Sequence, residues 1–218
     1  MEFSVQTANP AKTETACLLV PVFKGSDLLP TVAKLDDASE RLIGQLLERG
    51  DFDATLGNVQ LVPFAPGLGA ERILLVGLGE REKCQEAAFI KALDAAMAAL
   101  VKLPIDEASV VFGDVPLADR DPAWKARKVM EAAERAIYRF DQFKSSPAPA
   151  LSLAKLTLMI SDADTVSQVK QGALVGNAIG QGINYTRTLG NLPANICTPR
   201  YLAEQAEQLG RDSKGALE

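Results

Sequence analysis

Histidine is absent from this chain of 218 residues, and no apolar run approaches the roughly 18 residues that a membrane-spanning helix needs. The first absence excludes a histidine general base, a histidine metal ligand and a Ser-His-Asp arrangement within this chain. The second predicts that the chain has no membrane span. Hydrophobic residues make up 47% and charged residues 23%, which is typical of a globular domain with a sizeable core.

Cysteine is scarce as well. Cys17, Cys84 and Cys197 lie far apart and form no C-x-x-C motif. This spacing favours free thiols in a reducing compartment over a disulfide framework or a zinc knuckle. The opening Met1–Ser4 lacks the basic and apolar regions of a secretory signal. We therefore expect a cytoplasmic localisation.

Basic residues are outnumbered by acidic ones, 23 to 28, which gives a net charge of −5. Broad affinity for nucleic acids or anionic membranes needs a positive field, so this balance argues against both partners.

Short apolar runs and alternating patterns predict strands that alternate with helices. The strands are expected at residues 17–20, 59–63, 73–76, 110–112 and 155–160. Pro63 favours an edge position for the second strand, and alternation in the last strand predicts one less protected face. Helices are expected at 29–46, at 88–100, and from the cap Asp121 onward, with an apolar face that reaches Phe143.

From about Asp164 one long helix is predicted, without a further strand. The pattern indicates an α/β fold, a mostly parallel or mixed sheet with helices on both faces, followed by a long connecting helix. We expect an amino-terminal domain at residues 1–163, the connecting helix at 164–194, and the truncated start of a second domain at 195–218.

The segment RTLGNLPANICTPRYLA, Arg187 to Ala203, predicts a helix stop, a rigid crossing and a helix start. Gly190 can adopt the positive φ that closes a helix, and the proline after Leu192 forces that residue to be extended. Thr198 then caps a new helix with a proline at its first position. A stiff connector leading into another domain indicates that the chemistry lies beyond this chain.

The part of this segment from Asn191 onward resembles the opening of the catalytic domain in the leucine (cytosol) aminopeptidase family of two-metal exopeptidases. Its most specific pattern is N-x-P-x-N-x-x-T-P. The opening MEFSV, the stretch ERILLVGLG (Glu71 to Gly79) and the stretch AIYRFDQFK (Ala136 to Lys144) are similar to the amino-terminal domain of bacterial members. The resemblance therefore runs along the whole chain.

This resemblance implies a fold like that of macro domains and a parent enzyme that removes amino-terminal residues from peptides. It further implies two divalent metals, manganese or zinc, and a homo-hexamer that this domain helps to assemble while narrowing access to the active sites. The metal ligands and catalytic groups of relatives lie in a Gly-Lys-Gly stretch leading to D-x-G-G and in NTDAEGR. Neither string occurs here, so we assign no catalytic, cofactor-binding or metal-binding residue and expect this chain alone to be inactive.

Two motifs have competing interpretations. Gly77-Leu78-Gly79 follows a predicted strand, as a dinucleotide fingerprint would, but the third glycine is replaced by Glu82, which favours a tight turn. Paired aspartates could hold a cation, but they fall at predicted turns and helix starts, where capping is favoured. These pairs are Asp51/Asp53, Asp119/Asp121 and Asp162/Asp164.

A basic cluster on the third helix keeps open the alternative of a module that binds DNA or a nucleotide-like ligand. It comprises Lys125, Arg127, Lys128, Arg135 and Arg139. Some enteric members of the family bind DNA, which supports this alternative by resemblance only. Because Glu131 stands four residues from both Arg127 and Arg135, internal pairing on a solvated helix face is the favoured interpretation.

Gly172, Gly176 and Gly180 repeat every fourth residue on the long predicted helix and so share one face. Glycine within a helix costs about 1 kcal/mol relative to alanine. Three such glycines predict a compensating close approach to a neighbouring helix or domain.

Overall fold

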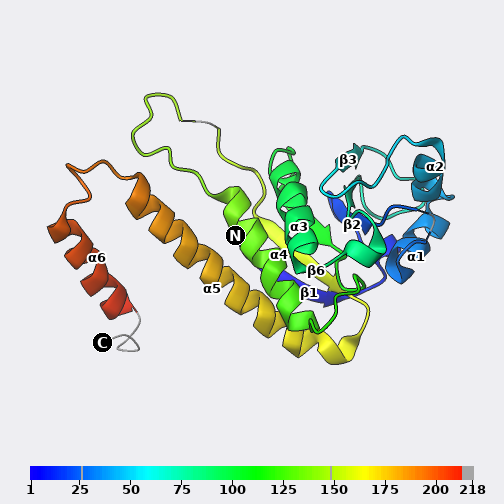
Figure 1. Cartoon of the computed structure of the whole chain (residues 1–218). Helices are drawn as coiled ribbons and strands as arrows, with labels where there is room; N and C mark the ends of the chain where they lie inside the picture. Colours follow the sequence, from blue (N-terminus) through cyan, green and yellow to red (C-terminus); the bar gives the residue numbers. More distant parts are fainter. Residues whose placement is uncertain (26, 148, 213–218) are drawn as a thin grey trace.

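The computed structural model describes residues 1–25, 27–147 and 149–212, in which strands and helices alternate (Figure 1). The strands are β1 Glu2–Thr7, β2 Leu18–Val22, β3 Val59–Val62, β4 Ile73–Gly77, β5 Glu107–Val110 and β6 Lys155–Ile160. The helices are α1 Pro30–Ala38, α2 Leu42–Arg49, α3 Glu86–Leu100, α4 Pro122–Ile137, α5 Val166–Asn191 and α6 Pro199–Asp212. Short 3-10 turns lie at Pro10–Lys12, Arg81–Lys83 and Ala163–Thr165.

The six strands form one sheet in the order β1-β6-β5-β2-β4-β3. All neighbours pair in parallel except β3, which runs antiparallel to β4 at one edge. The edge position is the one that Pro63, directly after β3, predicts, because proline cannot donate a hydrogen bond to a further strand. The predicted α/β class with a mixed sheet is confirmed.

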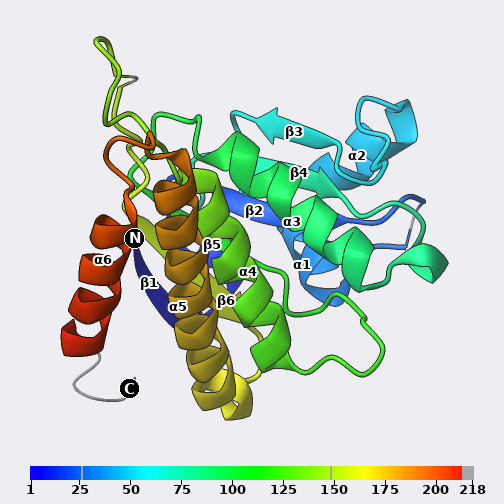
Figure 2. The same ribbon diagram turned by 60° about the vertical axis from the view of Figure 1, so that its left-hand side comes forward.

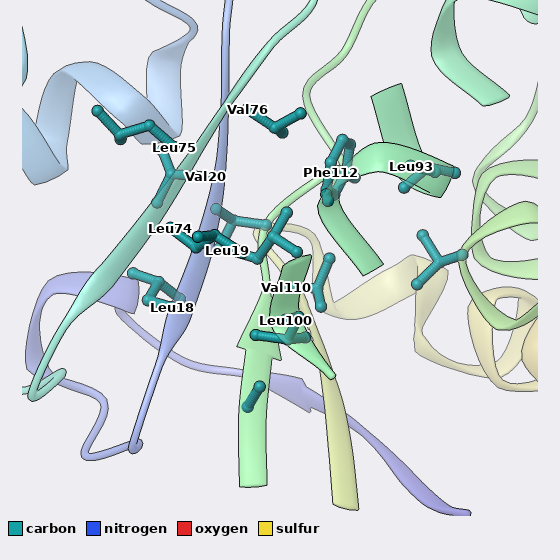
Figure 3. Packing of buried hydrophobic residues seen from close by; sticks show 14 of the residues in the cluster. Leu18, Leu19, Val20, Leu74, Leu75, Val76, Leu93, Leu100, Val110 and Phe112 are labelled. Carbon is teal, nitrogen blue, oxygen red and sulfur yellow. The ribbon is translucent and has the colours of Figure 1, made fainter. Parts of the chain in front are cut away.

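Helices cover both faces of this sheet, with α3, α4 and α5 in front of it and α1 behind it in Figure 2. The core is built on continuous apolar runs in neighbouring strands, such as Leu18-Leu19-Val20 in β2 and Leu74-Leu75-Val76 in β4 (Figure 3). Leu93 and Leu100 of α3 pack onto it from one side. Parallel strands covered on both sides need such runs, since neither face meets water.

The single helix expected at 29–46 is wrong, because the structure has α1 and α2 with a sharp reversal between them. Glu40 and Arg41 adopt left-handed backbone conformations, at φ 57° and 63°. The Ser39 hydroxyl donates to the carbonyls of Leu35 and Asp36 and so closes α1. The apolar residues of both helices belong to the core or pack against it. The apolar pattern therefore continues through the reversal, and the sequence gives no sign that the helix is interrupted there.

Three further expectations need correction. β6 has no less protected face, because Thr157 and Met159 are as well buried as their neighbours, and β6 lies between β1 and β5 in the sheet. β5 ends at Val110, where the strand was expected to begin, although the following residues remain buried. α4 ends at Ile137, and Phe140 and Phe143 instead stack on each other in the loop beyond it, 5.9 Å apart.

The long helix is confirmed as α5, but Gly190 does not end it. Gly190 lies within the last turn and has no positive φ. The helix stops because Leu192 is extended, with ψ 138°, as the following proline requires. Thr198 caps α6 as predicted, with its Oγ1 accepting the Tyr201 N–H at 3.3 Å.

The glycine face of α5 packs directly on α4, which confirms the predicted close approach. A Cβ atom added at Gly172 would overlap the Ala123 carbonyl, and one at Gly176 would overlap the Arg127 carbonyl. One added at Gly180 would overlap the side chain of Glu134. The two helices therefore touch backbone to backbone at Gly172 and Gly176, and backbone to side chain at Gly180, which no larger residue would permit.

Gly176→Ala should destabilise the domain by roughly 1–3 kcal/mol, because the new methyl group meets backbone that cannot turn aside. Gly182→Ala is the matched control on the same helix. Nothing lies within 4 Å of a Cβ there, so this change should be neutral or stabilise by up to about 1 kcal/mol through helix propensity. Urea denaturation followed by circular dichroism measures both. Equal stability of the two variants would contradict the packing argument.

Candidate functional site

The basic residues of α4 do not form an open cationic surface. Lys125 Nζ donates to the Gly113 carbonyl at 2.8 Å, and Arg135 bonds the Asp94 carboxylate at 2.6 Å. Arg139 lies beyond the helix and donates to the Pro149 carbonyl. All three side chains therefore form hydrogen bonds with neighbouring groups within the domain.

Glu131 is the centre of the remaining charges on α4. Its side chain is only 7% exposed, and its carboxylate accepts from Arg127 Nε and Lys128 Nζ, each at 2.7 Å, while Arg135 Nη1 lies 3.9 Å away. Burial raises the pKa of this carboxyl, but hydrogen bonds and charge from Lys128 and Arg127 outweigh it, so the pKa lies below its usual value. The predicted internal pairing of this helix is confirmed, but the expected solvated face is wrong at its centre, because Glu131 is buried.

Glu134 lies one turn further and has the opposite electrostatics. It is also buried, its Oε1 has no hydrogen-bond partner among the described residues, and the Met1 amine stands 3.9 Å away. Burial raises the pKa of the Glu134 carboxyl, and the nearby amine offsets this only in part. Gly180 and Asn184 of α5 lie against this residue; the Asn184 amide donates to its backbone carbonyl at 2.8 Å.

Gly77-Leu78-Gly79 lies at the carboxyl end of β4, and Gly79 has a left-handed backbone conformation with φ 74°. Its three N–H groups donate to the carbonyls of Asn58, Val22 and Ala54, at 2.8 to 3.0 Å. A phosphate would need these donors. A Cβ at Gly77 would overlap the Thr55 carbonyl, so the glycine is needed for chain packing. The occupied donors leave the dinucleotide interpretation without support, but the expected tight turn is wrong as well, because residues 78–80 form neither a hydrogen-bonded turn nor a bend.

One aspartate of each pair caps local backbone, as predicted. Asp53 accepts the Thr55 N–H, Asp121 the Trp124 N–H and Asp162 the Asp164 N–H, at 2.7 to 3.0 Å. No group of three or more Asp, Glu, Cys or His side chains suited to a metal ion occurs among the described residues.

The three cysteines are free thiols, as predicted. Cys17 is fully buried, and this burial raises the pKa of its thiol to about 12. Such a thiol stays protonated and is a poor nucleophile. Separately, none of the helices in the described ranges has the length and hydropathy to cross a membrane.

A cluster around Tyr138 joins two segments on which the family resemblance rests. The Arg187 guanidinium lies over the Tyr138 ring, 3.9 Å from its centroid. The Tyr138 hydroxyl is 3.0 Å from Asn191 Nδ2 and 3.2 Å from Thr188 Oγ1. Spacing alone gives no sign of these contacts, since more than forty-five residues separate the partners; only the shared resemblance of the two segments points to them.

The outer surface of α5 and α6 is the part of the domain with the most exposed apolar side chains. We call it the α5–α6 surface; it comprises Leu174, Val175, Ile183, Tyr185, Leu202 and Leu209, all 38–49% exposed. α6 buries none of its described residues and stands away from the sheet (Figure 1). The Tyr185 hydroxyl donates to Gln205 at 2.9 Å and joins the two helices. Clustered apolar exposure of this kind marks an interaction surface.

An α/β domain followed by a long, partly uncovered helix is the class of structure that these features define. A model described as "Cytosol aminopeptidase family, N-terminal domain" matches residues 19–147. The chain therefore belongs to the cytosol aminopeptidase family, as the resemblance predicted.

Curated relatives extend the match to the whole chain. The chain is 66% identical over 217 residues to a probable cytosol aminopeptidase of Chromohalobacter salexigens, covering 100% of this chain and 43% of that protein. It is 38% identical over 215 residues to the cytosol aminopeptidase of Pseudomonas aeruginosa, covering 99% and 43%. The chain thus spans less than half the length of these relatives.

Solved structures share the fold. A tomato leucine aminopeptidase variant aligns with a TM-score of 0.78 and 21% identity, over 97% of this chain and 42% of that one. The bottromycin maturation enzyme BotP aligns with a TM-score of 0.69 and 22% identity, over 92% and 38%.

Glu131→Gln and Glu134→Gln should change the pH dependence of stability in opposite directions. The depressed pKa of Glu131 means that its carboxylate stabilises the fold above the unfolded pKa of about 4.3, and that this contribution is lost as pH falls through the folded pKa. Glu131→Gln should therefore cost about 1–3 kcal/mol at neutral pH and progressively less in acid.

The raised pKa of Glu134 gives the opposite dependence of stability on pH. Its contribution is most favourable below pH of about 4 and declines as pH rises through the folded pKa. Glu134→Gln should thus gain stability relative to wild type between acid and neutral pH. Urea unfolding of the three proteins across this range measures both trends. Parallel pH profiles for the two variants would contradict the assignment.

Proposed function

We propose that this chain is the non-catalytic amino-terminal domain of a two-metal leucine aminopeptidase that removes amino-terminal residues from peptides. The match of an amino-terminal-domain model to residues 19–147 carries this proposal. The 43% coverage of the relatives leaves room for a separate catalytic part in the longer protein.

The parent enzyme would use two divalent cations, manganese or zinc, as the family resemblance implies. A solved structure of BotP is of its complex with Mn. The described residues do not fit such a centre, because no cluster of three or more ligating side chains is present among them. We therefore place the metal ligands and catalytic groups outside this chain and assign none to residues 1–218.

The role of the domain would be architectural. We propose an α/β domain at residues 1–163, a connecting helix at 164–194 and the start of the catalytic domain at 195–218. The α5–α6 surface supports this division, since its exposed apolar side chains need a cover that a larger protein would supply. In the parent, the domain would help to assemble a homo-hexamer and restrict the active sites to small peptides. A cytoplasmic location fits the names of the curated relatives.

A DNA-binding or nucleotide-binding module is the alternative. The contacts of α4 weigh against DNA, because its cations are held by Glu131, by Asp94 and by backbone carbonyls. The occupied N–H groups of Gly77–Gly79 weigh against a phosphate site there.

Residues 1–218 alone should fold, show no turnover of leucine anilide with excess manganese or zinc, and retain no stoichiometric metal after dialysis. The longer protein, expressed from the same gene with its downstream part, should hydrolyse the same substrate. Chromogenic assay and metal analysis measure both. Turnover that copurifies with the 218-residue chain, or inactivity of the longer protein with both metals, would contradict the proposal.

The chain should bind duplex DNA only weakly and non-specifically, with Kd above about 10 μM at physiological salt. Fluorescence anisotropy with a labelled duplex measures this. Submicromolar binding that is lost in the triple variant Arg127→Ala, Lys128→Ala, Arg135→Ala, but kept in Lys170→Ala, would establish the alternative function instead.

A further inference from the structure

A pocket of about 560 Å³ lies between the end of β2, the reversal from α1 to α2, and the segment after α2. Its volume is in the range of small-molecule sites. Leu28, Leu47 and Phe52 supply apolar walls. The pocket sits at the α1–α2 end of the molecule, far from the α5–α6 surface (Figure 1).

Five charged residues line this pocket, and three of them are already paired. Arg41 and Glu48 form a salt bridge with each other at 2.6 Å. Asp53 accepts from the Thr55 N–H, the Thr55 hydroxyl and the Asn58 amide, and these hydrogen bonds hold its pKa below the usual value. These side chains are satisfied without a ligand.

The other two charges, Lys24 and Asp36, are of opposite sign and have unused capacity. Lys24 is exposed at the pocket and forms no salt bridge within the part of the chain that the structure describes, although its charge makes a minor contribution to the lowered pKa values of Asp53 and Glu80. Asp36 is 94% buried, yet only its Oδ1 has a donor, the Gly44 N–H at 2.9 Å. A buried carboxylate normally accepts further hydrogen bonds, so Oδ2 has room for a donor from a ligand.

The backbone beside Asp36 is strained as well. Glu40 and Arg41 are consecutive non-glycine residues with positive φ, a conformation that costs on the order of 1–3 kcal/mol at each residue. Such strain persists where the surrounding structure holds it, often at ligand-binding sites. Here the strained residues lie at the pocket, where Arg41 pairs with Glu48.

We propose that this pocket binds a small zwitterion with an apolar body, that is, an amino acid with a large apolar side chain. Its ammonium group donates to Asp36, its carboxylate meets Lys24, and its side chain packs among Leu28, Leu47 and Phe52. A carboxylate oxygen without a donor, a lysine without a salt bridge and apolar walls match this chemical class. Binding here does not depend on the proposed peptidase role of the parent.

The test uses L-phenylalanine and two analogues, each lacking one charge, titrated into the 218-residue chain by ligand-observed NMR. L-Phenylalaninamide lacks the carboxylate, and N-acetyl-L-phenylalanine lacks the ammonium. L-Phenylalanine should bind saturably, and each analogue about tenfold more weakly or worse, since each loses a charge-assisted hydrogen bond.

Two variants assign the charges to residues. Lys24→Gln should weaken L-phenylalanine about tenfold and leave the amide unchanged, because the amide has no carboxylate to lose. Asp36→Asn should weaken both ligands but not the N-acetyl analogue. Lys170→Gln, an exposed lysine on α5, is the control and should bind like wild type.

Absence of saturable binding by L-phenylalanine into the millimolar range would overturn the proposal. So would equal binding of all three ligands, or a Lys24→Gln variant that binds them as wild type does. If Asp36→Asn unfolds in a thermal melt, the analogue series on wild type and Lys24→Gln decides the matter without it.

Discussion

The backbone contact between α4 and α5 is the constraint on which much of this domain depends. Gly172, Gly176 and Gly180 have no Cβ on the face of α5 that meets α4, so the carbonyls of Ala123 and Arg127 can lie against it. α5 is thereby fixed in direction long before it leaves the sheet. Its far end, and α6 beyond it, are positioned by this seam together with the Tyr138–Arg187 stacking contact. A helix that mainly contacts one neighbour needs such an exact fit, because few other contacts hold it.

The same seam explains the electrostatics of α4. Side chains on the face of α4 that meets α5 must be small, or buried if they are charged. The cations of α4 therefore pair with Glu131. Three hydrogen-bonding or nearby cations make that burial tolerable, whereas Glu134 has only the Met1 amine and retains a raised pKa. The pKa values of Glu131 and Glu134 thus shift in opposite directions because the charges around the two carboxyls differ. The sequence of α4 is rich in basic residues, but in the folded domain carboxylates of the same domain pair with them.

Local chemistry predicted the parts of the fold that depend on neighbours in sequence. The Asp121 and Thr198 caps, the edge strand before Pro63 and the glycine face of α5 were all recognisable, since each is a short-range pattern with one physical meaning. The α1–α2 break was not, because two non-glycine residues with positive φ have no sequence signature. The candidate sites divide in the same way between local and long-range features. The capping aspartates could be predicted from the sequence, whereas the fold was needed to show that Lys24 and Asp36 line one pocket.

What the domain leaves unsatisfied indicates where it meets other molecules. Its core, its caps and the ion pairs around Glu131 are completed within the described residues, so these features need no partner. Two places differ. The α5–α6 surface exposes apolar side chains on helices otherwise held at one seam, which suits a large and permanent cover such as the rest of a longer chain. The Lys24–Asp36 pocket is small and carries one charge of each sign, which suits an exchangeable molecule. These two places lie at opposite ends of the fold, so a cover on the α5–α6 surface need not touch the pocket (Figure 1).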